Sequence, residues 1–247
     1  YVLLYDNEII LQGTAGRFNK RNSLPVTDSS IYGIGSTSKM FTTVAVMLLL
    51  DQGKLDLDKP VTSYVPDFVM ADPRYKEITA RMLLNHSSGL MGTRYTNGGL
   101  FDDPNTFNHE TLLTALAGQR LKADPGAYAV YCNDGFSLAE LVVERVSGLT
   151  FSEFIRENIT KPLGLSNTLT PQDDFDRGLM ARTFARGDET PPETLNLIGS
   201  GGIYSTASEL CLFGQIFMDN PGNGTAKDLL SPASKCPRHI KKHRHHR

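Results

Sequence analysis

The sequence predicts an α+β fold in which a helical domain packs on an antiparallel sheet. The chain begins with two short apolar runs of β type, residues 1–5 and 9–13. A long apolar helix is indicated at residues 37–52, and further helical stretches joined by loops continue as far as residue 218. A few strands followed by a large helical body are typical of the α+β class.

The N-terminal strands are predicted to form a hairpin. Asn7 lies between the two runs and tolerates the positive φ that tight hairpin turns require. Residues 31–34 form a third short extended segment, which leads directly to Ser36. Because so few strands need a partner for their apolar face, we expect the helix at 37–52 to cover them.

The helix at 37–52 is predicted to be buried. From residue 36 to residue 50 the only charged side chain is Lys39, and Gly53 is expected to end the run at the C′ position, as glycine commonly does. Ser36 and Lys39 are three residues apart and therefore share one helix face. Burial would lower the pKa of the lysine, and an amine of this kind can activate a neighbouring hydroxyl as a nucleophile.

The remaining chain is organised by helices and turns. Helices are predicted at residues 78–84, 109–121, 136–146, 151–159 and 206–218, with a long loop at 93–108 and tight turns at 125–126 and 199–202. We assign the first strands of a sheet domain to 1–35, a mainly helical domain to 36–220, and the start of a return to the sheet domain to 221–247.

Composition excludes several classes of function. The 247 residues are 40% hydrophobic and 21% charged, which is ordinary for a globular protein, and no apolar run has transmembrane length. The cysteines, Cys132, Cys211 and Cys236, show neither a disulfide framework nor metal-ligand spacing. Four of the six histidines crowd into the last nine positions. We therefore expect no metal and no cofactor.

The basic C-terminal tail contrasts with an acidic body. Residues 235–247 hold six Lys or Arg and no acid, whereas residues 1–234 carry 19 basic against 27 acidic side chains, a net charge of −8. Such a tail can bind nucleic acid. Here it contains no aromatic residue, and a nucleic-acid footprint normally extends over the domain itself. We expect no nucleic-acid binding, and we interpret the tail as an engineered or out-of-frame end.

A second candidate group lies near Tyr131. A phenol can relay protons when a nearby ammonium lowers its pKa, and Lys39 is the candidate cation. Asn133, two residues further on, points the same way if this segment is extended. A Ser-His-Asp triad through His86 or His109 is an alternative. The chain contains no G-x-S-x-G sequence, so an α/β-hydrolase elbow is unsupported.

Together these residues resemble the superfamily of serine β-lactamases, penicillin-binding proteins and esterases, nearest its class C-like branch. The resemblance follows the family's order over residues 1–234, with serine commonly standing in place of Cys132. It rests on residues 34–39 (I-G-S-T-S-K), 51–58, 83–90 (L-L-N-H-S-S-G-L), 125–133, 162–165 and 201–206.

The resemblance implies a β-lactamase/transpeptidase-like fold and a site with defined roles. Ser36 would attack an acyl carbonyl, and Lys39 with Tyr131 would take and return the proton. Asn133 would hold the substrate's amide or position Lys39. The backbone N–H of Ser36 would supply half of an oxyanion hole. His86 would be structural.

The same resemblance implies the substrates and the compartment. The substrate would be a small molecule or peptide with an acyl group: a β-lactam, a D-Ala-D-Ala-type peptide or an ester. An extracellular or periplasmic location is typical of the family. Cys132 would be a small buried side chain.

One family feature is missing from the sequence. A third motif, K-T-G or H-x-G, normally lies on a strand at the edge of the cleft, and the chain contains neither. The family pattern stops at residue 234. We therefore expect a C-terminally truncated or frameshifted chain that lacks the last strands of its sheet. Such a chain would be a weak or inactive hydrolase unless a second chain completes it. The alternatives are a non-catalytic penicillin-binding module and a pseudoenzyme fragment.

Overall fold

The computed structural model describes residues 1–20, 24–93, 99–101, 108–218, 226 and 228–235, and for 108–110 the backbone alone. Its α-helices are α1 (Ser38–Asp51), α2 (Ala80–Leu84), α3 (Asn108–Ala117), α4 (Asn133–Ser147), α5 (Phe151–Ile155), α6 (Ala207–Gly214) and α8 (Pro232–Lys235). Shorter helical turns are η1 (Gly35–Thr37), η2 (Val61–Ser63), η3 (Pro73–Glu77), η4 (Arg156–Thr160), η5 (Arg177–Leu179), η6 (Ile198–Gly202) and η7 (Gln215–Phe217). None of these described helices combines the length and the apolar composition needed to cross a bilayer.

The strands are short and antiparallel. They are β1 (Val2–Tyr5), β2 (Glu8–Gln12), β3 (Tyr32–Gly33), β4 (Gly99–Phe101), β5 (Phe184–Ala185), β6 (Asp188–Glu189), β7 (Glu193–Leu195) and β8 (Tyr204–Ser205). Within the described part of the chain they pair in twos, β1 with β2, β3 with β8, β4 with β7 and β5 with β6. The architecture is therefore α+β, as the sequence predicts.

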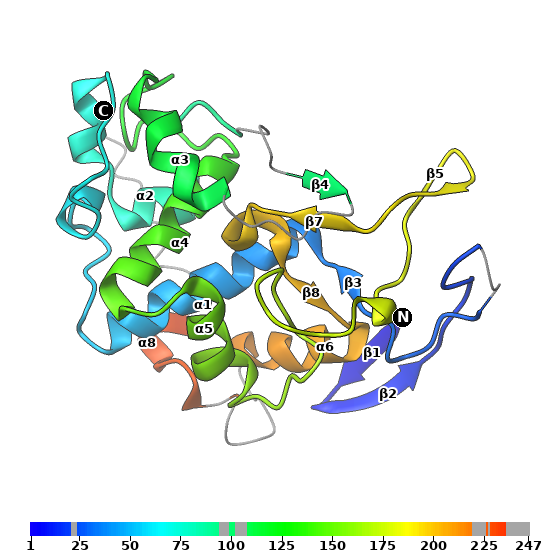
Figure 1. The fold of residues 1–247 in the computed structure, drawn as a ribbon. Coiled ribbons are helices and arrows are strands. Elements are labelled where there is room, and N and C mark those ends of the chain that lie inside the picture. The colour runs from blue at the N-terminus through cyan, green and yellow to red at the C-terminus, as the bar shows by residue number, and fades with distance from the viewer. Residues whose placement is uncertain (21–23, 94–98, 102–107, 219–225, 227, 236–247) are drawn as a thin grey trace.

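Helix α1 lies at the centre of the molecule, with α4 and the η6 turn packed against it (Figure 1). Phe41, Val44 and Leu49 on this helix are completely buried. Gly53 follows the helix with φ +67°, the left-handed conformation expected at a C′ glycine. The predicted buried helix is thus confirmed, and it forms the main part of the core.

The N-terminal hairpin is confirmed, but its packing partner differs from the prediction. Asp6 and Asn7 form the turn with φ values of 44° and 69°. The hairpin packs chiefly on α6, not on α1 (Figure 1), and the Gln215 side chain donates to the Asn7 carbonyl at 3.4 Å. The partners of α1 are chiefly α4 and η6, and outside the hairpin β1 contacts chiefly α6.

The third extended segment pairs far along the chain. Tyr32 and Gly33 of β3 lie opposite Ser205 and Tyr204 of β8. Because η1 follows β3 and η6 precedes β8, this pairing brings the start of α1 beside the η6 turn. The tertiary pairing of two-residue strands, and not the N-terminal hairpin, therefore positions Ser36.

Several helix ends differ from the sequence-based bounds. Helix α4 begins at Asn133, three residues before the predicted start, and α3 ends at Ala117, before Gly118. Within the predicted loop 93–108, residues 99–101 form β4 because they pair with β7. Residues 94–98 and 102–107 of that loop, and the tail beyond residue 235, lie outside the described residues.

The turn after α2 is tied to the segment that leads to Tyr131. The Lys122 and Gly126 N–H groups donate to the Gly89 and Ser87 carbonyls at 2.9 and 2.7 Å. Gly89 has φ +77°, and a Cβ at this position would lie 2.3 Å from the Ala123 carbonyl oxygen. Glycine is therefore required here both by conformation and by space.

We predict that Gly89→Ala destabilises the fold by about 3 kcal/mol or more, because strain and steric overlap add. Gly53→Ala is the matched control: its φ is +67°, but no atom lies within 4 Å of the new Cβ. We expect the control to cost only about 1–2 kcal/mol, the backbone term alone. Urea unfolding of both variants measures the difference, and equal losses would contradict the close approach.

Candidate active site

Ser36 lies in the η1 turn at the N-terminal end of α1. Gly35, which precedes it, has φ +51° and turns the chain from β3 into the helix. Ser36 is exposed, whereas Lys39, three residues later, is only 6% exposed. The predicted common face is observed: the Lys39 Nζ donates to the Ser36 Oγ at 3.3 Å.

The Lys39 ammonium joins three segments. Besides Ser36, it donates to the Asn133 Oδ1 at 2.7 Å and to the Ser200 carbonyl at 2.6 Å. It also lies over the Tyr131 ring, 4.7 Å from the centroid. Its three protons are therefore satisfied by three acceptors from η1, α4 and η6.

Burial lowers the pKa of Lys39, and contact with Tyr131 opposes this shift only in part. A lowered pKa brings the neutral amine, which can accept a proton, closer to physiological pH. The electrostatics of the site therefore match the chemistry that the Ser36–Lys39 spacing suggests.

Tyr131 contacts the same serine from the other side. Its hydroxyl donates to the Ser36 Oγ at 2.7 Å, and the residue is 53% exposed. Burial of the hydroxyl would raise its pKa, but contacts with Lys39 and Ser36 and the charge of Lys39 outweigh burial and lower the pKa. Ser36 thus has two proton-transfer partners within hydrogen-bond distance.

Asn133 joins this group through a helix start. The sequence argument relied on an extended segment through Asn133, but the chain becomes helical at Asn133, directly after the extended Cys132. The Asn133 Oδ1 faces Lys39, and its Nδ2 donates to the Thr93 Oγ1 at 2.9 Å. The structure therefore brings all four predicted residues together and adds Thr93, which the sequence did not indicate.

His86 lies against the site, although the sequence assigned it only to a packing turn. Its Nδ1 accepts the Cys132 N–H at 3.1 Å, and its ring centroid is 4.6 Å from that of Tyr131. Burial and the charge of Lys39 lower the pKa of His86, which favours the neutral ring that can accept this bond. The His-based triad has no geometric support: among the described contacts His86 packs on Tyr131, and the His109 side chain lies outside the described residues.

The η6 turn was predicted as a turn but not as part of a site. Its Gly199 carbonyl accepts the Thr42 hydroxyl at 2.6 Å, and its Gly199 N–H donates to the Glu140 Oε2 at 2.8 Å. The sequence did carry one signal: Glu140 is an acid within the largely apolar run 136–143 of α4. A buried acid on a helix face needs a partner, and here the partner is a backbone amide.

A cavity of about 460 Å³ opens beside these residues. Ser36, Lys39 and Tyr131 line it together with mostly apolar side chains, among them Met40, Val44, Met47, Leu84 and Phe136. A cavity of this size can hold a small molecule. Ser36 thus faces space that is lined largely by hydrocarbon.

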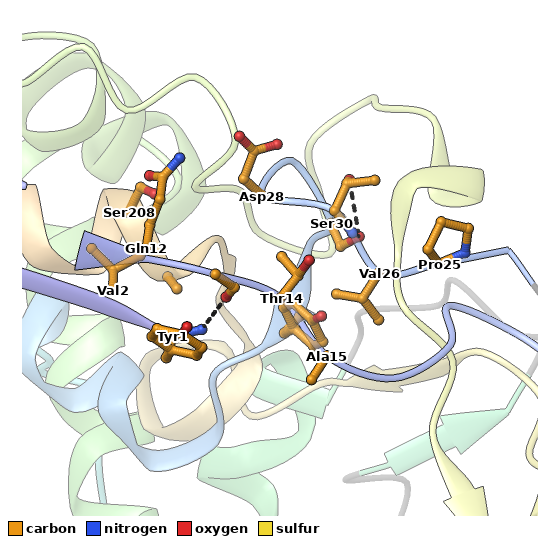
Figure 2. A pocket seen from close by; sticks show the side chains of 14 residues that line it. Tyr1, Val2, Gln12, Thr14, Ala15, Pro25, Val26, Asp28, Ser30 and Ser208 are labelled. Carbon is orange, nitrogen blue, oxygen red and sulfur yellow. Dashed lines mark hydrogen bonds between the residues drawn. The ribbon is translucent and has the colours of Figure 1, made fainter.

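A second hollow, of about 540 Å³, lies at the end of the N-terminal hairpin (Figure 2). Its lining includes Val2, Gln12, Val26 and Ser208 and shares no residue with the cavity at Ser36. The Tyr1 ammonium donates to the Gly13 carbonyl at 2.8 Å beside it (Figure 2). Among the residues that the structure describes, no cluster of three or more His, Cys, Asp or Glu could hold a metal ion.

Known proteins are similar to this chain in both sequence and fold. The chain is 34% identical over 204 residues to the D-alanyl-D-alanine-carboxypeptidase/endopeptidase AmpH of Escherichia coli, covering 81% of this chain and 51% of that protein. It is 28% identical to penicillin-binding protein 4 of Amycolatopsis lactamdurans, covering 89% of this chain and 59% of the relative. The chain therefore spans about half the length of the curated relatives it matches.

The D-amino acid amidase of Ochrobactrum anthropi superposes with a TM-score of 0.72 at 23% identity, covering 90% of this chain and 63% of the amidase. This likeness shows the β-lactamase/transpeptidase-like fold. The model of the beta-lactamase family matches residues 1–237. With its fold shared and nearly its whole length matched, the chain belongs to the beta-lactamase family, a family of serine hydrolases.

Proposed function

We propose that the chain acts on amide, β-lactam or ester carbonyls through an acyl-enzyme at Ser36. The observation that carries this proposal is the geometry of one oxygen. The Ser36 Oγ lies 2.7 Å from the Tyr131 hydroxyl and 3.3 Å from the Lys39 Nζ. A nucleophile within reach of two groups of adjusted pKa is the arrangement that acyl transfer needs.

The reaction follows from these positions. The Ser36 Oγ forms a bond to the carbonyl carbon while its proton passes to Lys39 or Tyr131 in the form that can accept it. The carbonyl oxygen becomes an oxyanion, which the Ser36 N–H at the start of α1 stabilises. When the intermediate collapses, the C–N or C–O bond breaks and the leaving group takes the proton. Water then attacks the acyl-enzyme by the reverse proton path and releases the acid.

The relatives guide the choice of substrate. One is named a D-alanyl-D-alanine-carboxypeptidase/endopeptidase, another a penicillin-binding protein, and the fold neighbour a D-amino acid amidase. The names of the carboxypeptidase/endopeptidase and the amidase share an amide carbonyl beside a D-configured residue. We therefore propose D-Ala-D-Ala-type peptides and β-lactams as the first substrates to test, followed by short-chain esters.

A second candidate is a penicillin-binding module that keeps its acyl group. One relative is named penicillin-binding protein 4. The Ser36 Oγ lies within hydrogen-bond distance of Tyr131 and Lys39, which supports formation of the acyl bond and leaves its hydrolysis as a separate step. Such a module would be acylated at Ser36 like the proposed hydrolase, and it would differ from the hydrolase only in releasing the acid slowly.

Mass spectrometry after mixing with a penicillin tests the proposal directly. We expect a covalent adduct on Ser36 that is absent in Ser36→Ala and retained in Ser29→Ala, an exposed serine that serves as the control. Release of the free acid with time identifies the hydrolase, and a persistent adduct identifies the binding module. The absence of adducts from penicillin, D-Ala-D-Ala peptide and ester alike would refute both candidates.

The pH dependence of acylation should show which group takes the proton. Protonation of Lys39 abolishes its role as acceptor, so the rate should fall as the pH is lowered through the pKa of Lys39. Tyr131 raises the pKa of Lys39. Tyr131→Phe should therefore move this acid limb to lower pH and reduce the plateau rate by about 10²-fold. A limb that moves to higher pH would exclude Lys39 as the acceptor.

His86→Asn tests the contact with Tyr131. Asn tolerates the left-handed φ of 63° at this position but removes the ring that packs on the phenol. We expect a roughly 10-fold slower acylation, because a small displacement of the phenol misaligns proton transfer. Stopped-flow fluorescence with a labelled penicillin measures the rate, and an unchanged rate in a folded variant would show that the ring does not position Tyr131.

A further inference from the structure

Glu140 is a deeply buried acid near the site, and the proposed reaction assigns it no task. It lies on α4, two turns after Asn133 and therefore on the same side of the helix. It is 1% exposed. Its Oε1 is buried and has no hydrogen-bond partner among the residues that the structure describes, and its Oε2 accepts the Gly199 N–H at 2.8 Å.

The contact between Glu140 and the η6 turn is tight. A Cβ added to Gly199 would lie 2.9 Å from the Glu140 Cβ, so the turn rests directly on the acid. The carbonyl of the same residue accepts the Thr42 hydroxyl at 2.6 Å, and the next carbonyl, of Ser200, accepts the Lys39 ammonium at 2.6 Å. The turn whose Ser200 carbonyl binds Lys39 is thus fixed at Gly199 by Thr42 of α1 and Glu140 of α4.

We propose that Glu140, as an uncharged carboxylic acid, is a positioning residue that fixes the η6 turn at the Gly199 N–H and thereby the Ser200 carbonyl that holds the Lys39 ammonium beside Ser36. This inference rests on the proposed acyl transfer for its kinetic consequence. Glu140 does not touch the substrate or the Ser36 oxygen. It acts through the Gly199 N–H, two peptide units before the Ser200 carbonyl, and the turn between them carries the effect to that carbonyl.

The uncharged form follows from the surroundings. An ionised carboxylate with one unpaired oxygen would be costly in this interior. The η6 turn carries no titratable side chain, and Glu144, one turn further along α4, adds a like charge. Burial, opposed by the Gly199 N–H and assisted by Glu144, raises the pKa of Glu140 to about 8.

Replacement variants separate the hydrogen bond from the charge. Glu140→Gln keeps the shape and an acceptor for Gly199, so we expect acylation by penicillin within about twofold of the wild type. Glu140→Leu leaves the amide unpaired and releases the turn. We expect its acylation rate constant to fall about 10–100-fold while the binding constant of the encounter complex stays unchanged. Glu144→Gln, on the same helix but bonded to the Phe151 N–H, is the control and should react normally.

Thr42→Val loosens the same turn from the α1 side. It keeps the proposal testable even if Glu140→Leu does not fold. It removes the hydroxyl donor to the Gly199 carbonyl with little change of volume. We expect a smaller fall of the acylation rate in the same direction. Wild-type rates in both Glu140→Leu and Thr42→Val would overturn the proposal.

The melting temperature across pH tests the uncharged state without any activity. Between the ordinary pKa of 4.5 and about 8, the folded protein keeps a proton that the unfolded chain has lost. As the pH rises through this range, the melting temperature of the wild type should therefore fall relative to that of Glu140→Gln, whose side chain does not titrate. Parallel profiles would show that Glu140 is ionised in the fold.

An NMR titration of the Lys39 ammonium distinguishes failure of this inference from failure of the proposed function. In Glu140→Leu the hydrogen bond from Lys39 to the Ser200 carbonyl is weakened, and this bond favours the charged form of Lys39. The pKa of Lys39 should therefore be lower in Glu140→Leu than in the wild type. If no variant or wild-type protein acylates Ser36, the proposed function fails, and this titration alone decides the positioning role. Identical Lys39 titrations in the two proteins would overturn it.

Discussion

The hydrogen bonds of the Lys39 ammonium are the interaction on which the site depends. A buried charge is expensive unless it is fully hydrogen-bonded, and the acceptors here come from Ser36, Asn133 and Ser200. These residues belong to η1, α4 and η6, which lie far apart in the sequence. The ammonium can therefore be buried only when all three segments are in place, which couples the geometry of the site to completion of the fold.

The helices around this ammonium also shape the electrostatics of the serine. Helices α1 and α4 both begin at the site, with Ser36 just before one and Asn133 as the first residue of the other. The N-terminal ends of helices favour negative charge. Two such ends beside one exposed hydroxyl suit a reaction in which an oxyanion forms. The apolar body of α1 then anchors this polar end, because Phe41 and Leu49 fix the helix in the core.

The site has two supporting layers that differ in exposure. On the open side, His86 packs on Tyr131 and receives the Cys132 N–H, so the phenol is backed by a neutral ring. On the closed side, Glu140 holds the turn whose Ser200 carbonyl receives Lys39. The phenol and the serine are exposed, whereas His86 behind the phenol is half-buried and Glu140 is fully buried. Such support is what keeps reacting groups within the narrow geometry that acyl transfer requires.

The sequence by itself determined the local features. The apolar run after Lys39 predicts a buried helix because no face of it can tolerate water, and the order of motifs identifies the family that the family model confirms. The sequence also predicted the four residues Ser36, Lys39, Tyr131 and Asn133, which lie together in the structure. Only the tertiary structure decided that the hairpin packs on α6, that α4 begins at Asn133, and that β4 forms within a predicted loop.

The same division holds for the partners of the site. Spacing places Ser36 and Lys39 on one face because a helix repeats every few residues. Nothing in local spacing shows that His86 reaches Tyr131 or that Glu140 reaches Gly199, since 45 and 59 positions separate these pairs. Contacts of this kind arise from how helices and turns pack, and packing also determines which charges are buried. The sequence thus determined which groups are present, and the tertiary structure decided their protonation and their orientation.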